Sequence, residues 1–150
     1  MVLSRTRSLA AVAAAVLIGT ALAGCGSSSS STLTKAEFQT KANKLCADAN
    51  KDTDSYGANI SQTSSDADVA EAIQKTVKRN NQLVDDVDAL KPPKDIADDV
   101  DAMLKNVRAG NAELGKIASV KDLMSFNPDG GVFKEANDQA KALGLDTCAQ

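Results

Sequence analysis

Histidine and tryptophan are absent from this chain, and its aromatic residues are one tyrosine and three phenylalanines. Without histidine the chain cannot form a Ser-His-Asp triad or a Cys-His pair, and it lacks the commonest side-chain ligand of transition metals. The few aromatic side chains leave little of the flat surface on which proteins stack sugars or bases. These absences exclude several common catalytic and nucleic-acid-binding classes.

Carboxylates are plentiful, but the sequence marks no two of them as a catalytic pair. General acid–base chemistry needs carboxyl groups held in a cleft with shifted pKa values. The spacing of the 20 Asp and Glu residues singles out no such pair. We therefore expect a protein that is not an enzyme and that binds no cofactor.

The N-terminal segment has the three-part layout of an export signal. Arg5 and Arg7 form a short positive region, and residues 9–22 are apolar apart from Gly19 and Thr20. A helix of this length would span only about 21 Å, whereas the hydrocarbon core of a bilayer is roughly 30 Å thick. The pattern therefore favours a signal peptide over a stable transmembrane helix.

The apolar segment ends in Leu22-Ala23-Gly24-Cys25, which resembles the lipobox of bacterial lipoproteins. The resemblance implies that Cys25 receives a diacylglyceryl group and becomes the first residue after cleavage. The alternative is an ordinary secretory signal followed by an incidental cysteine. A serine-rich stretch follows, and such a composition cannot bury enough apolar surface to order itself. We predict a signal peptide at 1–24, a lipidated cysteine and flexible tether at 25–33, and one folded domain at 34–150.

The charge balance of the predicted mature chain is acidic. Removing residues 1–24 leaves 15 Lys and Arg against 20 Asp and Glu, a formal charge of −5. An acidic, well-mixed surface argues against nucleic acid or anionic lipid headgroups as partners. Acyl chains on Cys25 would still hold the domain at the membrane. We expect it at the extracytoplasmic face of a bacterial cell membrane, with the membrane and an envelope protein or cell-wall component as partners.

The two remaining cysteines, Cys46 and Cys148, are most simply explained as a disulfide in an exported domain. Closing a loop of about 100 residues contributes up to roughly 4.7 kcal/mol in the chain-entropy model. A redox-active pair is the alternative, but the chain contains no CxxC motif. We predict a structural disulfide between Cys46 and Cys148.

Apolar residues recur with helical spacing in every substantial segment, and no segment alternates convincingly as a strand does. Thr34 with Glu37 and Ser65 with Asp68 match the capping box that begins a helix. The predicted inward-facing residues are Phe38, Ala42, Leu45, Cys46 and Ala49 in the first helix; Val69, Ile73, Val77, Val84, Val87 and Leu90 in the second; Ile96, Val100, Met103, Leu104, Val107, Leu114 and Ile117 in the third; and Phe133, Ala136, Ala140 and Leu143 in the last. Asn80 and Asn81 interrupt the second of these stripes.

Glycine and proline mark where the helices end. Gly57 is a plausible end for the first helix, and Pro92 with Pro93 ends the second, so that the third begins near Pro93. Residues 119–126 form a short helical turn, residues 127–131 a tight turn, and Gly144 follows the last helix. We predict an all-α fold, an antiparallel four-helix bundle closed by one disulfide. The alanines of the first and last helices would let these two helices approach closely.

A family resemblance spans most of the mature chain. It rests on the segments Leu33-Thr34-Lys35-Ala36-Glu37-Phe38, Leu45-Cys46-Ala47, Leu90-Lys91-Pro92-Pro93 and Leu143-Gly144-Leu145, followed by Cys148. Together with the lipobox, this pattern resembles small secreted lipoproteins of actinobacteria, whose function is unknown. The resemblance implies a helical, disulfide-closed extracytoplasmic domain, and it implies no activity.

Acidic residues gather on both sides of the two prolines. Among them Asp95, Asp98, Asp99 and Asp101 are weak candidates for a metal site, because a cation such as Ca²⁺ prefers oxygen ligands. Favourable placement at the start of a helix and exposure to solvent explain the same residues without a metal. We favour that explanation and predict no metal site.

Two functional hypotheses follow. The first is a non-enzymatic interaction or accessory module of the cell envelope, which binds its partner through an exposed face of the bundle. The second is a binding module for a small apolar ligand or lipid held between helices, because stripes rich in alanine and poor in aromatic residues pack loosely.

Overall fold

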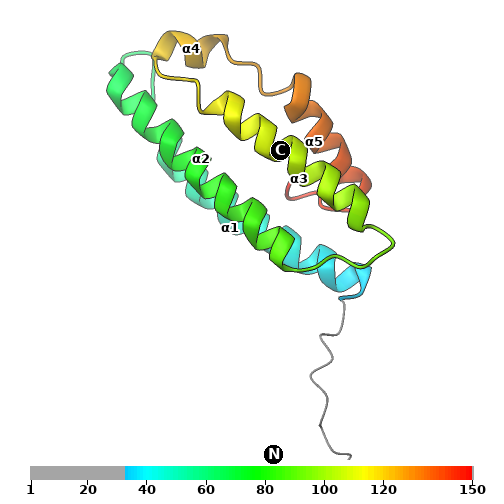
Figure 1. Ribbon diagram of the computed structural model, residues 1–150. Helices are drawn as coiled ribbons and strands as arrows, with labels where there is room; N and C mark the ends of the chain where they lie inside the picture. Colours follow the sequence, from blue (N-terminus) through cyan, green and yellow to red (C-terminus); the bar gives the residue numbers. More distant parts are fainter. Residues whose placement is uncertain (1–32, 150) are drawn as a thin grey trace, which may run out of the picture. The chain divides into compact units, whose positions relative to one another are not determined.

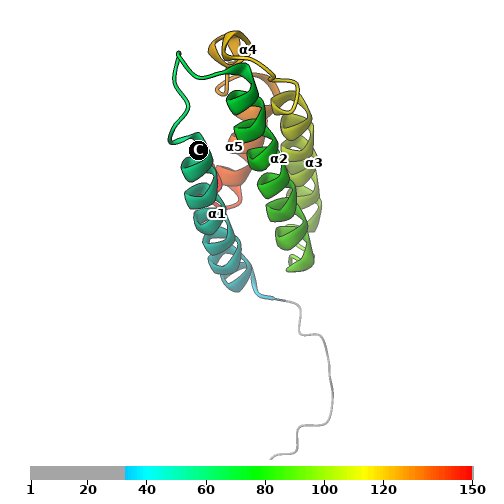
Figure 2. The same cartoon turned by 90° about the vertical axis from the view of Figure 1, so that its left-hand side faces the viewer.

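Helices α1 (Lys35–Gly57) and α2 (Asp66–Ala89) lie side by side and form a hairpin (Figures 1 and 2). The computed structural model describes residues 33–149, and within this range the chain is all-helical, with no β-strand. Helices α3 (Ala97–Leu114), α4 (Val120–Ser125) and α5 (Gly131–Ala142) bring the described range to five helices. The predicted signal peptide, Cys25 and the tether as far as residue 32 lie outside the described residues.

Both predicted capping boxes are present. The amide of Thr34 donates to the Glu37 carboxylate over 2.9 Å, and the amide of Glu37 donates to the Thr34 hydroxyl over 3.3 Å. Ser65 and Asp68 repeat this exchange at the start of α2, over 3.3 Å and 3.1 Å. Each box satisfies backbone amides that have no partner within their own helix. α1 ends at Gly57, as the sequence predicts.

Helix α3 begins at Ala97, later than the predicted start near Pro93. The amide of Ile96 instead donates to the carbonyl of Pro93 over 3.0 Å, which closes a turn ahead of the helix. Lys91 and Pro92 each precede a proline, which disfavours α geometry at both positions, and Lys91 has a positive φ of 55°. Ile96 is nevertheless buried, as its predicted inward position requires.

Helices α4 and α5 begin and end close to the predicted positions. The hydroxyl of Ser119 accepts from the amide of Asp122 over 3.1 Å at the start of α4. At the end of α5 the amide of Leu145 donates to the carbonyl of Ala140 over 2.8 Å, and Gly144 has a φ of +73°. This is a Schellman motif, which favours glycine at the left-handed position. A Cβ atom at Gly144 would also lie 2.5 Å from Nε2 of Gln39, so a side chain there would displace the end of the Gln39 side chain.

Most of the predicted inward-facing residues form two hydrophobic clusters. The larger cluster draws on α1, α2, α3, α5 and the segments that flank α3 and α5, and it contains Phe38, Ala42, Val84, Val87, Ile96, Val100, Met103, Leu104, Ala140, Leu143 and Leu145. The smaller cluster contains Val69, Ile73 and Ile117. Leu33, which was assigned to the tether, packs against the larger cluster, so core packing begins before Thr34.

Helix packing follows the order α1, α2, α3, α5. α3 and α5 approach closely, because Gly110 lies under the ring of Phe133 and Asn106 donates to the Gln139 side chain over 3.0 Å. No Cα atom of α1 lies within 8 Å of a Cα atom of α5. The predicted close packing of the first and last helices is therefore wrong. Ala42 and Ala140 share the larger cluster, but their helices stay apart.

The segment that follows α5, residues 143–149, lies against α1 in place of α5. Amide side chains of α1 donate to its backbone: Gln39 to the carbonyl of Leu143 over 2.7 Å, and Asn50 to that of Thr147 over 2.9 Å. The predicted disulfide between Cys46 and Cys148 is confirmed, with Cα atoms 5.1 Å apart. Side chains thus hold the C-terminal segment where the prediction placed a helix.

Within residues 33–149, none of the helices combines the length and the apolar character needed to cross a bilayer.

Candidate functional site

A cavity of about 280 Å³ lies among α1, α2, α3 and α5. Most of its wall is apolar, and several of the apolar side chains are buried members of the larger cluster. The apolar residues and the disulfide that line it are Cys46, Leu83, Val84, Val87, Met103, Leu104, Val107, Phe133, Ala136, Ala140 and Cys148. Both α1 and α5 line the cavity, and no Cα atoms of these two helices lie within 8 Å of each other.

Five polar side chains complete the wall, and all five are uncharged. They are Asn50, Thr53, Asn80, Asn111 and Asn137. Asn50 and Thr53 come from α1, Asn80 from α2, Asn111 from α3 and Asn137 from α5, so each of the four helices contributes at least one. All except Asn111 are half-buried, which places them nearer to solvent than the buried apolar side chains.

Asn111 is only 3% exposed, and it is the buried polar side chain of the described core. Its Nδ2 donates to Oδ1 of Asn81 over 2.9 Å. Its own Oδ1 accepts no hydrogen bond from another residue within 33–149. The buried side-chain polar atom without a hydrogen-bond partner in the described range is Nη1 of Arg79, and Oδ1 of Asn111 is not such an atom. Asn111 thus contributes to the cavity wall a side-chain oxygen that accepts no hydrogen bond from the described residues.

The donors of two other wall residues are already engaged within the protein. The side-chain amide of Asn50 donates to the carbonyl of Thr147 over 2.9 Å, and the hydroxyl of Thr53 donates to the carbonyl of Asn50 over 3.0 Å. Within the described range, Oδ1 of Asn50 accepts no hydrogen bond. The remaining hydrogen-bonding capacity of these side chains is thus mainly that of acceptors.

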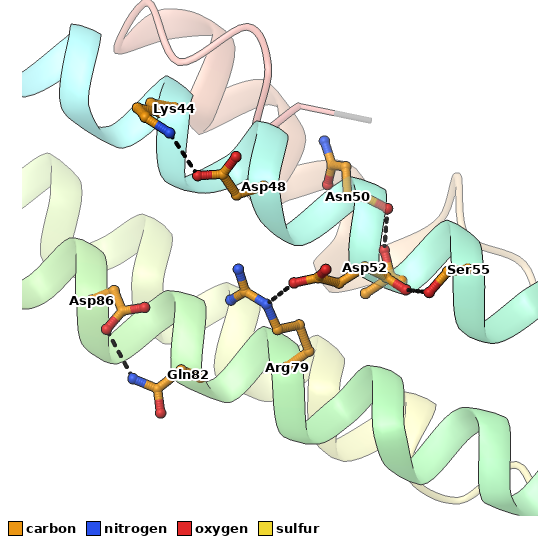
Figure 3. Close-up of polar contacts among 9 residues, drawn as sticks. Lys44, Asp48, Asn50, Asp52, Ser55, Arg79, Gln82 and Asp86 are labelled. Carbon is orange, nitrogen blue, oxygen red and sulfur yellow. Dashed lines mark hydrogen bonds and ion pairs between the residues drawn. The ribbon is translucent and has the colours of Figure 1, made fainter.

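The ion pair between Arg79 and Asp52 borders the cavity wall in sequence. Figure 3 shows Arg79 reaching from α2 to Asp52 on α1, where its Nε donates to the carboxylate over 2.7 Å. These residues precede the wall residues Asn80 and Thr53, but neither lines the cavity. The two charges neutralise one another, so the pair brings no net charge to the adjoining wall.

The disulfide forms part of the wall. Cys46 is buried on α1, Cys148 is half-buried, and both line the cavity. The C-terminal segment that carries Cys148 is fixed to α1 by Asn43, whose side chain donates to Gly144 and accepts from Thr147, each over 3.0 Å. The segment thus closes part of the interval between α1 and α5.

No protein-family model, no curated protein and no solved structure matches this chain. The geometry of the described residues is therefore what supports a functional proposal.

The acidic residues around the two prolines are dispersed over the surface. Asp95, Asp98, Asp99 and Asp101 are all exposed. Within residues 33–149, no three His, Cys, Asp or Glu side chains are grouped so that they could hold a metal ion. The structure thus gathers these weak candidates into no common site.

The shifted carboxyl pKa values of the described chain belong to helix caps and surface ion pairs. Hydrogen bonds from Thr34 lower the pKa of Glu37, and a hydrogen bond from Ser119 lowers that of Asp122. The pKa of Asp48 is lowered by its hydrogen bond with Lys44, an ion pair shown in Figure 3. None of these carboxyl groups lines the cavity.

Two features of the sequence lie at this site. Asn80 interrupts the apolar stripe of α2, and it lines the cavity. Gln39, Asn43, Cys46 and Asn50 follow one another at spacings of four, three and four residues, which places them on one helix face. Side-chain amides on this face of α1 indicate that it packs against exposed backbone groups, as it does against the C-terminal segment, and not against the apolar face of another helix.

Proposed function

We propose that the helical domain is a non-enzymatic binding module for a small, largely apolar ligand held between its helices. The observation that carries this proposal is the cavity among α1, α2, α3 and α5, with apolar side chains over most of its wall and five uncharged polar side chains, four of them half-buried and one buried. Ligand pockets in proteins have this composition. The cavity volume of about 280 Å³ lies just below the lower end of the usual range, roughly 300 Å³.

The packing order supports the same proposal. In a closed bundle the first and last helices would fill the space between them with their own side chains. Here α1 and α5 remain apart, and the small side chains of Ala136 and Ala140 face the cavity. We describe the domain as an antiparallel four-helix bundle that is opened between α1 and α5 and partly closed there by residues 143–149.

The test uses a probe at Met103. This residue lines the cavity, whereas Met124 on α4 is 66% exposed and reports non-specific binding. With methyl-¹³C methionine in the full chain, titration with octanol should shift the Met103 methyl resonance in a saturable way and leave Met124 unmoved. Ala136→Leu, which fills the cavity, should abolish the shift. Ala109→Leu, at an exposed position on α3, should preserve it. An unresponsive Met103 would refute the proposal.

We further propose that the chain is a lipoprotein of the kind found in actinobacteria, anchored through Cys25 at the extracytoplasmic face of the membrane. The lipobox-like segment and the serine-rich stretch after it support this. Cys25→Ala should release the domain into the medium or leave an uncleaved precursor. A processed Cys25→Ala protein that stays on the membrane would contradict lipidation.

Binding of an envelope protein or cell-wall component through an exposed bundle face stays a prediction. Within the described range, Met124 is the exposed large hydrophobic side chain. The cavity gives the ligand-binding proposal the more specific structural support.

A further inference from the structure

We infer that the ligand of the interhelical cavity is an electrically neutral amphiphile of about a dozen non-hydrogen atoms, whose polar end carries a hydrogen-bond donor such as a hydroxyl. This inference rests on the proposed function and adds the chemical class of the ligand. It is carried by the charge, the hydrogen bonding and the volume of the cavity wall.

The charge of the ligand follows from the residues of the wall. Among the sixteen residues that line the cavity there is no Asp, Glu, Lys, Arg or Tyr. An ionised group placed among these side chains would lose its hydration without gaining a counter-charge, which disfavours binding strongly. The nearby Arg79 pairs through Nε with Asp52 over 2.7 Å, while its Nη1 is buried without a hydrogen-bond partner, and neither residue lines the cavity. A neutral ligand avoids this cost.

The donor on the ligand follows from the acceptors of the wall. Within residues 33–149 the amide oxygens of Asn50 and Asn111 accept no hydrogen bond, while the amide nitrogen of each already donates to the protein. The Thr53 hydroxyl has also given its proton, to the carbonyl of Asn50. These oxygens are satisfied by a ligand that donates, and a group that can only accept leaves them unpaired.

The body and the size of the ligand follow from the rest of the wall. Val84, Val87, Met103 and Leu104 are buried and apolar, so the greater part of a ligand meets hydrocarbon there. A cavity of about 150 Å³ accommodates benzene, and the present cavity, at about 280 Å³, has room for roughly twice as many atoms. An alkyl chain of medium length with one polar end fits these limits.

Four probes of similar shape separate the features of this inference. Octanol is neutral and donates a hydrogen bond, methyl heptyl ether is neutral and only accepts, and octanoate and octylammonium carry opposite charges. Each is titrated at neutral pH into the full chain labelled with methyl-¹³C methionine, and the Met103 resonance is followed. Octanol should bind at least tenfold more tightly than either ion, and about three- to tenfold more tightly than the ether.

The outcomes distinguish this inference from the proposed function. If octanoate or octylammonium binds as tightly as octanol, the neutral class is wrong although the cavity still binds ligands. If the ether equals octanol, the requirement for a donor is wrong. If none of the four probes moves Met103, the proposed function itself fails, and the inference fails with it.

A variant of Asn111 tests the acceptor directly. Asn111→Leu keeps a side chain of similar size and should remove the preference for octanol over the ether, while the ether itself still binds. Asn106→Leu is the matched control, because Asn106 lies on the same helix and bonds with Gln139 but does not line the cavity. A preference for octanol that survives in Asn111→Leu would overturn the role assigned to Asn111.

Discussion

The side-chain oxygen of Asn43 on α1 accepts a hydrogen bond from the backbone amide of Thr147, with 3.0 Å between the two atoms. The same side chain donates through Nδ2 to the carbonyl of Gly144 over 3.0 Å. One side-chain amide thus pairs with both a donor and an acceptor of the backbone segment that follows α5. The position of the C-terminal segment, and with it part of the cavity wall, depends on such amides.

Replacing Asn43 by alanine should loosen that segment. Two backbone groups of residues 144–147 would lose their partners, and we expect a loss of about 1–3 kcal/mol in the free energy of unfolding. Hydrogen exchange at the amide of Thr147 should accelerate more than exchange within α2. Gln74→Ala, at an exposed position of α2, is the control and should change neither quantity measurably. Unaltered exchange at Thr147 in Asn43→Ala would show that the disulfide alone holds the segment.

The disulfide should contribute a larger share of the stability. Its cysteines are 102 residues apart, so the bond constrains most of the domain in the unfolded state. Replacing both Cys46 and Cys148 by serine should lower the free energy of unfolding by about 2–5 kcal/mol, measured by urea denaturation. Thiol titration of the purified domain should find neither Cys46 nor Cys148 reactive. Equal stability of the double variant and the parent protein would contradict this prediction.

Gly110 should resist substitution, although it lies within a helix. A Cβ atom there would stand 2.8 Å from Cε1 of Phe133, whose ring also packs edge-to-face on Phe126 with centroids 5.2 Å apart. Overpacking costs about 1–3 kcal/mol, whereas alanine gains roughly 1 kcal/mol of helix propensity over glycine. We expect Gly110→Ala to be destabilising in the parent protein.

The reason can be tested with a second substitution. Phe133→Leu removes the ring that a Cβ atom at position 110 would meet. In that background Gly110→Ala should become stabilising, and a double-mutant cycle measured by urea denaturation would report the change of sign. A Gly110→Ala variant that is equally destabilising in both backgrounds would mean that some contact other than Phe133 opposes the methyl group.

Glu37 should couple stability to pH through its capping box. Hydrogen bonds from the amide and the hydroxyl of Thr34 hold the pKa of Glu37 below its usual value of 4.5 in the folded protein. The folded chain therefore binds fewer protons than the unfolded chain near that pH. The stability that Glu37 contributes is present above pH 4.5 and is lost as the pH falls through the lower, folded-state pKa.

Thr34→Ala removes one of these hydrogen bonds and should raise the pKa of Glu37 toward 4.5. An NMR titration of the Glu37 side chain measures this directly. Thr40→Ala, which removes an exposed hydroxyl bonded to Ala36 in the same helix, should leave the titration unchanged. If the Glu37 titration were the same in Thr34→Ala, the hydroxyl would have no part in the shift.

Local patterns predicted most of the helix boundaries because the groups that begin and end a helix are close together in sequence. The capping boxes at Thr34 and Ser65 and the glycine at position 144 each act within five residues. The start of α3 was the exception. There two adjacent prolines led into a hydrogen-bonded turn from Pro93 to Ile96, and the pattern of apolar residues could not distinguish that turn from the first turn of a helix.

The cysteine pairing could also be predicted from the sequence, because the assignment of Cys25 to lipid leaves Cys46 and Cys148 only one another as partners. Which helices pack against one another could not be predicted from the sequence. Periodicity shows which face of α1 is apolar, but it does not show that the amides of Gln39, Asn43 and Asn50 would meet the C-terminal segment. That contact depends on where α5 ends and on how far it stands from α1.

The sequence by itself determined the helical class, most of the helix ends and the disulfide, because each depends on nearby residues or on a count of cysteines. Only the tertiary structure decided the candidate site. The cavity exists because α5 packs on α3 and stays away from α1. Its wall combines residues of four helices and of the C-terminal segment, some as distant in sequence as Cys46 and Cys148. No local sequence rule relates such residues. Whether the space between α1 and α5 stays open or is filled by side chains depends on packing across the whole domain.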